Sequence, residues 1–369
     1  MAEKLRDLTN HRLLPKAPQT RVRGNWKKFK ERCTSIANKS KTLSVVLSLS
    51  AVTAFSSLSC NQPGTTWDPD PTIPGGYDPC GEEVALGLKA DTPQELDELV
   101  GVTDIAYNLQ IEYVAGLEDL KGLDTLLCVW KNLIIKGNPD LETMEGLDNL
   151  WHIRRELGIT HNPRLENLAG LSALEETNIL TIKYNPSLVT LEGIDSLTHI
   201  KWGDISFNES LVTLHGLETL GPILETSLSG HISIRENALL EDIDGLSGIV
   251  EMRNIWFSIT DNPSLVSLEG LRNARKLTSI SIESNNALQN VDGLRNLETV
   301  AGALTISNNA SLQDLEGLNS LTSLGETLTI TYNSSLPQEE AERIRDNLIA
   351  NGWEGTAEIH HNGTGENYD

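Results

Sequence analysis

Four acidic residues, each directly before a glycine, recur at intervals of 23–25 residues: Asp244, Glu269, Asp292 and Glu316. If each repeat occupies one strand spacing, these carboxylates lie about 5 Å apart. Ca²⁺ prefers several carboxylate oxygens, so a calcium site is one interpretation. Asp-Gly and Glu-Gly are also ordinary turn pairs with solvated side chains, and the sequence has no glycine-rich calcium nonapeptide. The solvated turn is the preferred interpretation, so we predict neither a metal site nor a cofactor.

Aromatic and basic side chains recur at two adjacent positions of the same repeat. One position holds Tyr113, His161, Tyr184, Phe207 and Tyr332, and the position before it holds Lys136, Lys183 and Arg235. If both positions face solvent on a sheet, His161, Tyr184 and Phe207 form a row about 5 Å apart. These residues are the candidate face for a glycan or protein ligand. The alternative is that stacked side chains only stabilise the sheet, by a few tenths to about 1 kcal/mol per pair.

The first 60 residues are typical of an exported lipoprotein. Residues 1–42 carry 12 Lys/Arg and 3 Asp/Glu, and the uncharged run at 43–58 has the length of a signal-peptide core rather than of a membrane span. Ser57-Leu58-Ser59-Cys60 resembles the lipobox of bacterial lipoproteins, although the leucine is one place too near the cysteine. We therefore expect lipidation at Cys60 and anchoring at the outer membrane or cell surface. An uncleaved signal anchor and plain secretion are the alternatives, and a start codon assigned too far upstream would explain the long basic segment.

The rest of the chain is strongly acidic. Residues 61–369 hold 17 Lys/Arg and 49 Asp/Glu, a net charge of −32. Such a field repels phosphate backbones, so nucleic-acid binding is excluded as a function class. Residues 61–79 are rich in Pro, Gly and Asp and indicate a tether.

The cysteines predict one disulfide. Cys33 lies in the leader and Cys60 is the expected lipidation site, so Cys80 and Cys128 remain as one pair. In an oxidising compartment this pair predicts a disulfide, and the alternative is two buried free thiols. The histidines show no metal-ligand spacing, since His360 and His361 are adjacent and the others are scattered.

An internal repeat of about 24 residues determines the expected fold. An asparagine recurs with apolar residues five and three places before it, leucine three places after it and usually glycine eight places after it. The asparagines, which we call the ladder asparagines, are Asn138, Asn162, Asn185, Asn208, Asn237, Asn262, Asn285, Asn309 and Asn333. Two degenerate copies, with Val114 and Asn362 in this place, flank them.

Each repeat translates into one coil, or rung, of a solenoid. The apolar pair, such as Leu180 and Ile182, predicts a strand with one buried face. The asparagine can turn inward and satisfy backbone groups at the corner, and the glycine supplies a permissive backbone for the next corner. Since no repeat buries its apolar edge alone, about ten rungs stack into a mainly β solenoid with a parallel sheet.

The recurring pattern, seen in residues 181–193 as TIKYNPSLVTLEG, resembles the receptor L domain, the leucine-rich-repeat-like fold of the insulin and epidermal growth factor receptors. It is most similar to bacterial, myxobacteria-like surface lipoproteins that carry this repeat behind a signal peptide. The resemblance covers about 260 of the 369 residues. It implies a right-handed parallel β-helix that binds ligands or acts at the cell surface without catalysis. The receptors' cysteine-rich module, transmembrane helix and kinase are missing from this sequence, so receptor signalling is not implied.

The predicted organisation has five parts. Residues 1–60 are leader and signal peptide, 61–79 the linker, 80–104 an N-terminal cap, 105–336 the solenoid, and 337–369 a capping helix, a last strand and a tail. The N-terminal cap helix begins near Asp91-Thr92-Pro93, and the C-terminal helix places Ala341, Ile344 and Leu348 on one face.

The expected function is that of a non-catalytic cell-envelope lipoprotein that binds a glycan or a protein. A purely structural envelope protein is one alternative. A β-helix polysaccharide-degrading enzyme is another, but it needs clustered carboxylates on adjacent rungs, and the outward strand positions hold mostly Ser, Thr and single charges of mixed sign.

Overall fold

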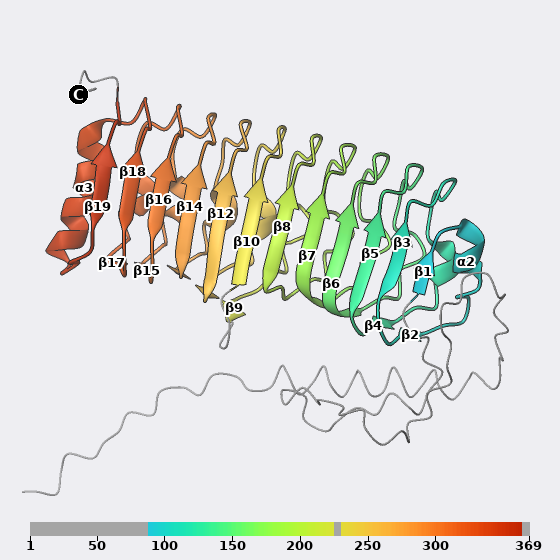
Figure 1. Cartoon of the computed structure of the whole chain (residues 1–369). Helices are drawn as coiled ribbons and strands as arrows, with labels where there is room; N and C mark the ends of the chain where they lie inside the picture. Colours follow the sequence, from blue (N-terminus) through green and yellow to red (C-terminus); the bar gives the residue numbers. More distant parts are fainter. Residues whose placement is uncertain (1–87, 225–229, 364–369) are drawn as a thin grey trace, which may run out of the picture. The chain divides into compact units, whose positions relative to one another are not determined.

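The computed structural model describes residues 88–224 and 230–363, which form one elongated solenoid (Figure 1). Fourteen strands, one or two from each repeat, lie in a single sheet in which all pairs are parallel, which we call the main sheet. The predicted mainly β solenoid of about ten rungs is therefore confirmed. Within the described ranges no helix combines the length and the apolar character that crossing a bilayer requires. The apolar run at 43–58, Cys60, the linker and Cys80 lie outside them.

The main sheet has a simple spatial order that follows the chain. It contains β1 (Leu88–Ala90), β3 (Leu109–Glu112), β5 (Asn132–Lys136), β6 (His152–Thr160), β7 (Glu176–Lys183), β8 (Trp202–Ser206), β10 (Gly230–Arg235), β12 (Ile255–Thr260), β14 (Ser279–Glu283), β16 (Leu304–Ser307), β18 (Leu328–Thr331) and β19 (Ala357–His360). Two further strands, β2 (Asp104–Ile105) and β4 (Cys128–Val129), join it beside this path.

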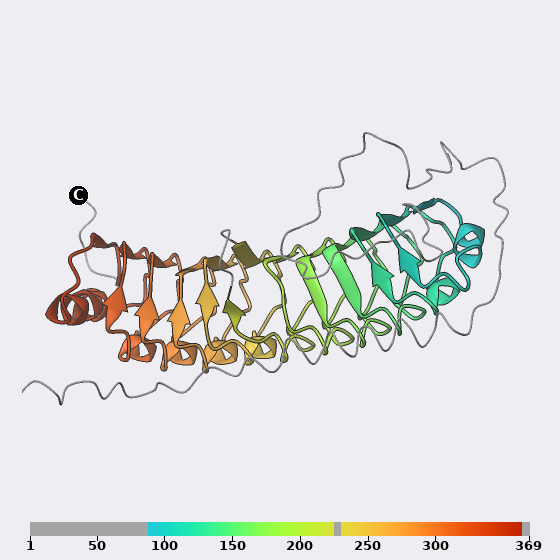
Figure 2. The ribbon, with the colours of Figure 1, turned by 90° about the horizontal axis from the view of Figure 1, so that it is seen from below.

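Short elements complete the coils. One small sheet pairs β9 (Ile223–Leu224) with β11 (Met252–Arg253), and another pairs β13 (Lys276–Leu277), β15 (Thr299–Val300) and β17 (Ser323–Leu324). The 3-10 helices are η2 (Lys121–Leu123), η3 (Asp244–Leu246), η4 (Glu269–Leu271), η5 (Asp292–Leu294) and η6 (Glu316–Leu318). Figure 2 shows η3–η6 in a row along the side of the solenoid away from the main sheet.

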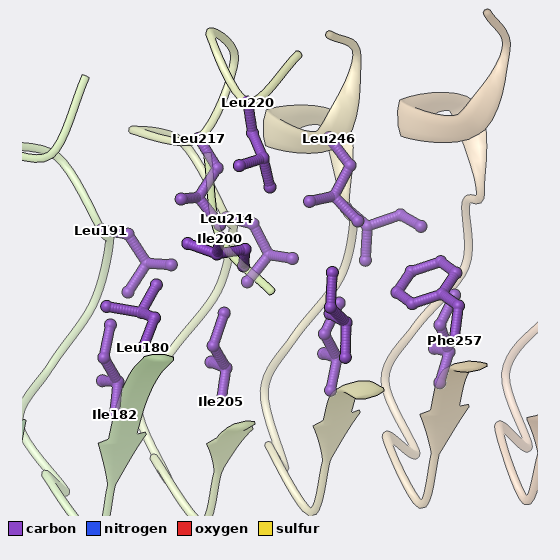
Figure 3. Packing of buried hydrophobic residues seen from close by; sticks show 14 of the residues in the cluster. Leu180, Ile182, Leu191, Ile200, Ile205, Leu214, Leu217, Leu220, Leu246 and Phe257 are labelled. Atoms are coloured by element: carbon purple, nitrogen blue, oxygen red, sulfur yellow. The ribbon is translucent and has the colours of Figure 1, made fainter. Parts of the chain in front are cut away.

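The core lies between the main sheet and these turns. In β7 the side chains of Leu180 and Ile182 are fully buried, because alternate residues of a strand point to one face. They pack against leucines of the turns, such as Leu191 (Figure 3). Gly203 replaces the usual apolar residue in β8. A Cβ atom there would lie 3.2 Å from Ile200 Cδ1 and 3.3 Å from Ile232 Cγ2, so neighbouring side chains fill the missing volume.

The nine ladder asparagines are all buried and form one continuous hydrogen-bond ladder. Asn185 is representative: its Oδ1 accepts the backbone N–H of Asn162 at 3.0 Å, and its Nδ2 donates to the Ile159 carbonyl at 3.0 Å. The ladder extends to Asn362 at the C-terminal end, whose Oδ1 accepts the backbone N–H of Asn333 at 3.2 Å. The ladder therefore satisfies a backbone donor and a backbone acceptor in every rung.

The repeated glycine has the expected conformation in the N-terminal half of the solenoid but not in the C-terminal half. Gly146 has φ +108° and Gly216 φ +112°, so in the N-terminal rungs the glycine does supply a left-handed corner. From Gly245 onward the equivalent residues lie in η3–η6, and their φ is not positive. In both halves, however, a Cβ atom would lie about 2 Å from a carbonyl oxygen of the preceding rung, for example 1.8 Å from Leu268 O at Gly293. Close approach between rungs is therefore the shared requirement.

Helices close both ends. The helix α2 (Pro93–Asp97) follows Thr92 as its N-cap and buries Leu96. At the other end, α3 (Gln338–Ala350) buries Ala341, Ile344 and Leu348. Both helices cover rung edges that would otherwise expose the apolar core.

Candidate ligand-binding face

The predicted aromatic positions do not lie on the sheet. The strand β7 ends at Lys183, and Tyr184 follows it in the left-handed region with φ 55°; His161 and Phe207 have φ 58°. The expectation of a row on a strand face was therefore wrong. In a regular strand Asn185, three residues after the inward-facing Ile182, would point outward. The positive φ of the residue before each ladder asparagine breaks this alternation and turns the asparagine inward. The ladder hydrogen bonds offset the strain of these residues, which is about 1–2 kcal/mol each.

At this corner the rings are nevertheless aligned. His161 and Tyr184 stack with centroids 4.6 Å apart, and Tyr184 and Phe207 stack at 4.7 Å with their planes 7° apart. The Arg235 guanidinium lies 4.9 Å from the Phe207 centroid and continues the line on the next rung. We call these four residues the corner row. It presents ring edges, a phenol hydroxyl and a cation. The row lies at the carboxyl ends of β6, β7, β8 and β10, which are the arrowheads in Figure 1.

Two of the three predicted basic residues share one partner, and the third lies apart. Lys183 and Arg235 both interact with Asp204, which lies between them on β8; the Arg235 Nη2 to Asp204 Oδ2 distance is 3.8 Å. Lys136 lies farther toward the N-terminus, with its Nζ 5.7 Å from the Tyr113 centroid. The structure thus brings His161, Tyr184, Phe207, Lys183 and Arg235 together and leaves Lys136 apart from them.

A second set of rings lies at the other end of the strands and escaped the sequence analysis. Trp202, His231 and Trp256 are paired in register at the beginnings of β8, β10 and β12, and we call them the tryptophan row. Trp202 is 43% exposed and Trp256 is 60% exposed. Each of the three stands six residues before a ladder asparagine. That offset is the signal that could have identified them.

The acidic positions before the glycines lie in η3–η6, and one of them, Glu269, forms an ion pair with arginine. The Arg295 guanidinium donates to both carboxylate oxygens of Glu269, at 2.6 and 3.0 Å, and this lowers the pKa of Glu269. Burial, with the neighbouring Asp242 carboxylate, raises the pKa of Asp244. In residues 88–224 and 230–363 no group of three His, Cys, Asp or Glu side chains is placed to hold a metal ion.

One unusually long repeat and the predicted disulfide involve residues outside the described ranges. The 29-residue gap between Asn208 and Asn237 contains residues 225–229, which are not described, and the ladder continues across it with a 3.1 Å hydrogen bond. Cys128 is buried in β4, and its predicted partner Cys80 is not among the described residues. The disulfide therefore stays a prediction.

Acid sensitivity is expected to arise in part from His152. Its side chain is 16% exposed and packs against the rings of Trp130 and Trp151. Burial lowers the pKa of His152, and the Glu176 carboxylate opposes this shift. Below the unfolded pKa, about 6.5, the unfolded chain takes up the proton first, so stability falls as the pH falls from there toward the folded pKa. The variant His152→Gln should thus lose less thermal stability than the wild type between pH 7.5 and 5.

His215 provides a control of opposite sign. A hydrogen bond with Glu218, 2.6 Å long, raises the pKa of His215. Its contribution is present below about pH 6.5 and is lost as the pH rises through its folded pKa, so His215→Gln should make the protein more acid-sensitive. Melting curves by circular dichroism at both pH values test the pair. Parallel pH profiles for the wild type and His152→Gln would contradict the role of His152.

No family model matches this sequence, and no curated protein matches it.

Proposed function

We propose that this chain is a non-catalytic lipoprotein of the bacterial cell envelope, of the receptor L domain type, whose solenoid presents the corner row to a glycan or protein ligand. The observation that carries the proposal is the alignment of His161, Tyr184, Phe207 and Arg235 on four consecutive rungs. Because stacking fixes these side chains before binding, a ligand need not pay their ordering entropy. Tyr184 is 42% exposed, which leaves its hydroxyl edge accessible to a partner.

The leader supports an envelope location. The lipobox-like Ser57-Leu58-Ser59-Cys60, followed by the linker at 61–79, would tether the solenoid to a membrane through lipidated Cys60. A disulfide between Cys80 and Cys128 would fit the same oxidising compartment. The absence of catalysis is proposed because two central carboxylates of the outer face are engaged: Asp204 with Lys183 and Arg235, and Glu283 with Ser281 and Ser307.

Ligand capture with corner-row variants tests this function. The full chain in detergent is incubated with an envelope extract and with a glycan array, and bound material is identified by mass spectrometry. The double variant Tyr184→Ala/Phe207→Ala should lower affinity for the captured ligand about tenfold to a hundredfold. Tyr332→Ala is the matched control, because Tyr332 stacks on His361 at 4.7 Å in the same type of corner near the C-terminal end.

The outcomes separate the proposal from its alternatives. Equal binding by the wild type and the double variant, or no ligand at all, would leave the rings with only a stabilising role. Depolymerisation of acidic glycans that is lost on replacing a rung carboxylate would favour the polysaccharide-degrading enzyme. In the same preparation, a diacylglyceryl-modified Cys60 at the N-terminus tests the anchor.

A further inference from the structure

We propose that the tryptophan row is a second binding site, for a neutral, extended glycan whose sugar units lie along the solenoid axis. It is separate from the corner row. β8 runs from Trp202 to Ser206, and at about 3.3 Å per residue Trp202 lies roughly 16 Å from Phe207. The inference goes beyond the proposed function, since it uses different residues at the opposite ends of the strands.

The spacing of the row requires an elongated ligand. His231 is in register with Trp202 on one side and with Trp256 on the other. Neighbouring strands are about 4.8 Å apart, so the two indoles lie about 10 Å apart across three rungs. A ligand that covers both must therefore be a chain of several units running across the strands. A single small molecule would contact only one indole.

The indole faces are available for stacking. The Trp202 and His231 planes are 79° apart and the His231 and Trp256 planes 58° apart, with centroids 6.3 and 6.4 Å apart. These rings meet edge-on or tilted, whereas Tyr184 and Phe207 stack with planes 7° apart and cover each other's faces. No ring of residues 88–224 and 230–363 stacks on either indole. Indoles that are 43% and 60% exposed on a regular sheet offer apolar faces of the kind on which the C–H face of a sugar packs.

The groups between the indoles are polar. The His231 Nε2 lies 3.2 Å from the Ser258 hydroxyl, and the Asp204 carboxylate follows Trp202 two residues along β8. Hydroxyl, imidazole and carboxylate groups match sugar hydroxyls, which both donate and accept. A wholly apolar partner would bury these groups without using their remaining capacity for hydrogen bonds.

The net negative charge of the chain favours a neutral glycan over an anionic one. Residues 61–369 carry a net charge of −32, and their field disfavours an anionic polymer. Near the row, Lys183 and Arg235 pair with the single Asp204 carboxylate and leave a local excess of one positive charge, which is small beside the net charge of −32.

The test titrates the full chain in detergent with neutral β-1,4- and β-1,3-linked gluco-oligosaccharides of two to six units, and with polygalacturonate as the anionic probe. Calorimetry and tryptophan fluorescence report binding. We expect affinity to rise from the disaccharide to the tetrasaccharide, as the chain becomes long enough to cover both indoles. Trp202→Ala and Trp256→Ala should each weaken hexasaccharide binding about tenfold. Trp256→Phe should retain most of the affinity, and Tyr184→Ala/Phe207→Ala should leave it unchanged.

Each result has a defined consequence. Neutral oligosaccharides that bind the wild type and both Trp→Ala variants equally, or that do not bind the wild type, would overturn the inference. Binding of polygalacturonate alone would overturn it too. Because the corner-row ligand is captured in a different assay, its retention by Trp202→Ala/Trp256→Ala would leave the proposed function intact. If no ligand were captured through the corner row but the oligosaccharides still bound through the indoles, the proposed function would fail and the tryptophan site would stand.

Discussion

Replacing Asn185 with alanine is expected to lower the free energy of unfolding by about 3–5 kcal/mol, because two buried backbone groups lose a partner and a small cavity forms. The backbone N–H of Asn162 would lose its acceptor, and the Ile159 carbonyl would lose a side-chain donor. Asn185 is fully buried, so water cannot replace either bond without opening the corner. Urea unfolding followed by circular dichroism measures the loss.

Asn178 gives a matched control for this change. It lies in the same strand, β7, but is exposed, and its Nδ2 makes one hydrogen bond, 2.9 Å long, to the Arg154 carbonyl. Asn178→Ala should cost less than about 1 kcal/mol, since water can satisfy the freed carbonyl. If the two alanine variants lost the same stability, the ladder would not be the main source of the corner's stability.

The sequence predicted the solenoid because the constraints on one rung are local and repeated. Leu180 and Ile182 must both point inward, Asn185 must lie at the corner, and Gly193 must approach the preceding rung, where its Cβ would lie 2.1 Å from Leu168 O. Each constraint fixes a residue type at a constant offset. A single sequence with nine copies therefore contains enough repetition to reveal the coil without any homologue.

The same reasoning failed where the backbone departs from regular geometry. Tyr184 was assigned to the solvent face of a strand beside Lys183, although strict alternation points adjacent residues to opposite faces, and the corner in fact begins at Tyr184. The aromatic side chain gave no warning, since left-handed residues are usually glycine or asparagine. Aspartate, serine and asparagine occupy this position in later rungs, at Asp261, Ser284 and Asn308, and they indicated the conformation more clearly.

The tryptophan row was missed for a different reason. Its position holds Glu156 and Ile179 on the preceding rungs and Ser279 on the following one, so no single residue type repeats there. Repetition reveals what the fold requires. Side chains that serve a ligand depart from the repeat. Trp202, His231 and Trp256 share only their offset of six residues from a ladder asparagine, and the strand register shows that this offset places them in one line.

Gly293→Ala is expected to destabilise the solenoid by about 3 kcal/mol or more, although Gly293 lies in a 3-10 helix whose backbone any residue can adopt. The new Cβ would lie 1.8 Å from Leu268 O and 2.2 Å from Leu268 C. These are backbone atoms of the preceding rung, so no rotamer change can relieve the contact. The rungs would have to separate locally, and this would weaken the packing of the leucines on both sides.

Two further glycines distinguish close packing from backbone conformation. At Gly221 a Cβ would have no neighbour nearer than 3.7 Å, so Gly221→Ala should change stability by less than about 0.5 kcal/mol. Gly146 combines a contact of 1.9 Å with Leu120 O and a φ of +108°. Gly146→Ala should therefore cost about 1–2 kcal/mol more than Gly293→Ala, because it adds left-handed strain to the same clash. A harmless Gly293→Ala beside a damaging Gly146→Ala would show instead that φ alone explains why glycine recurs.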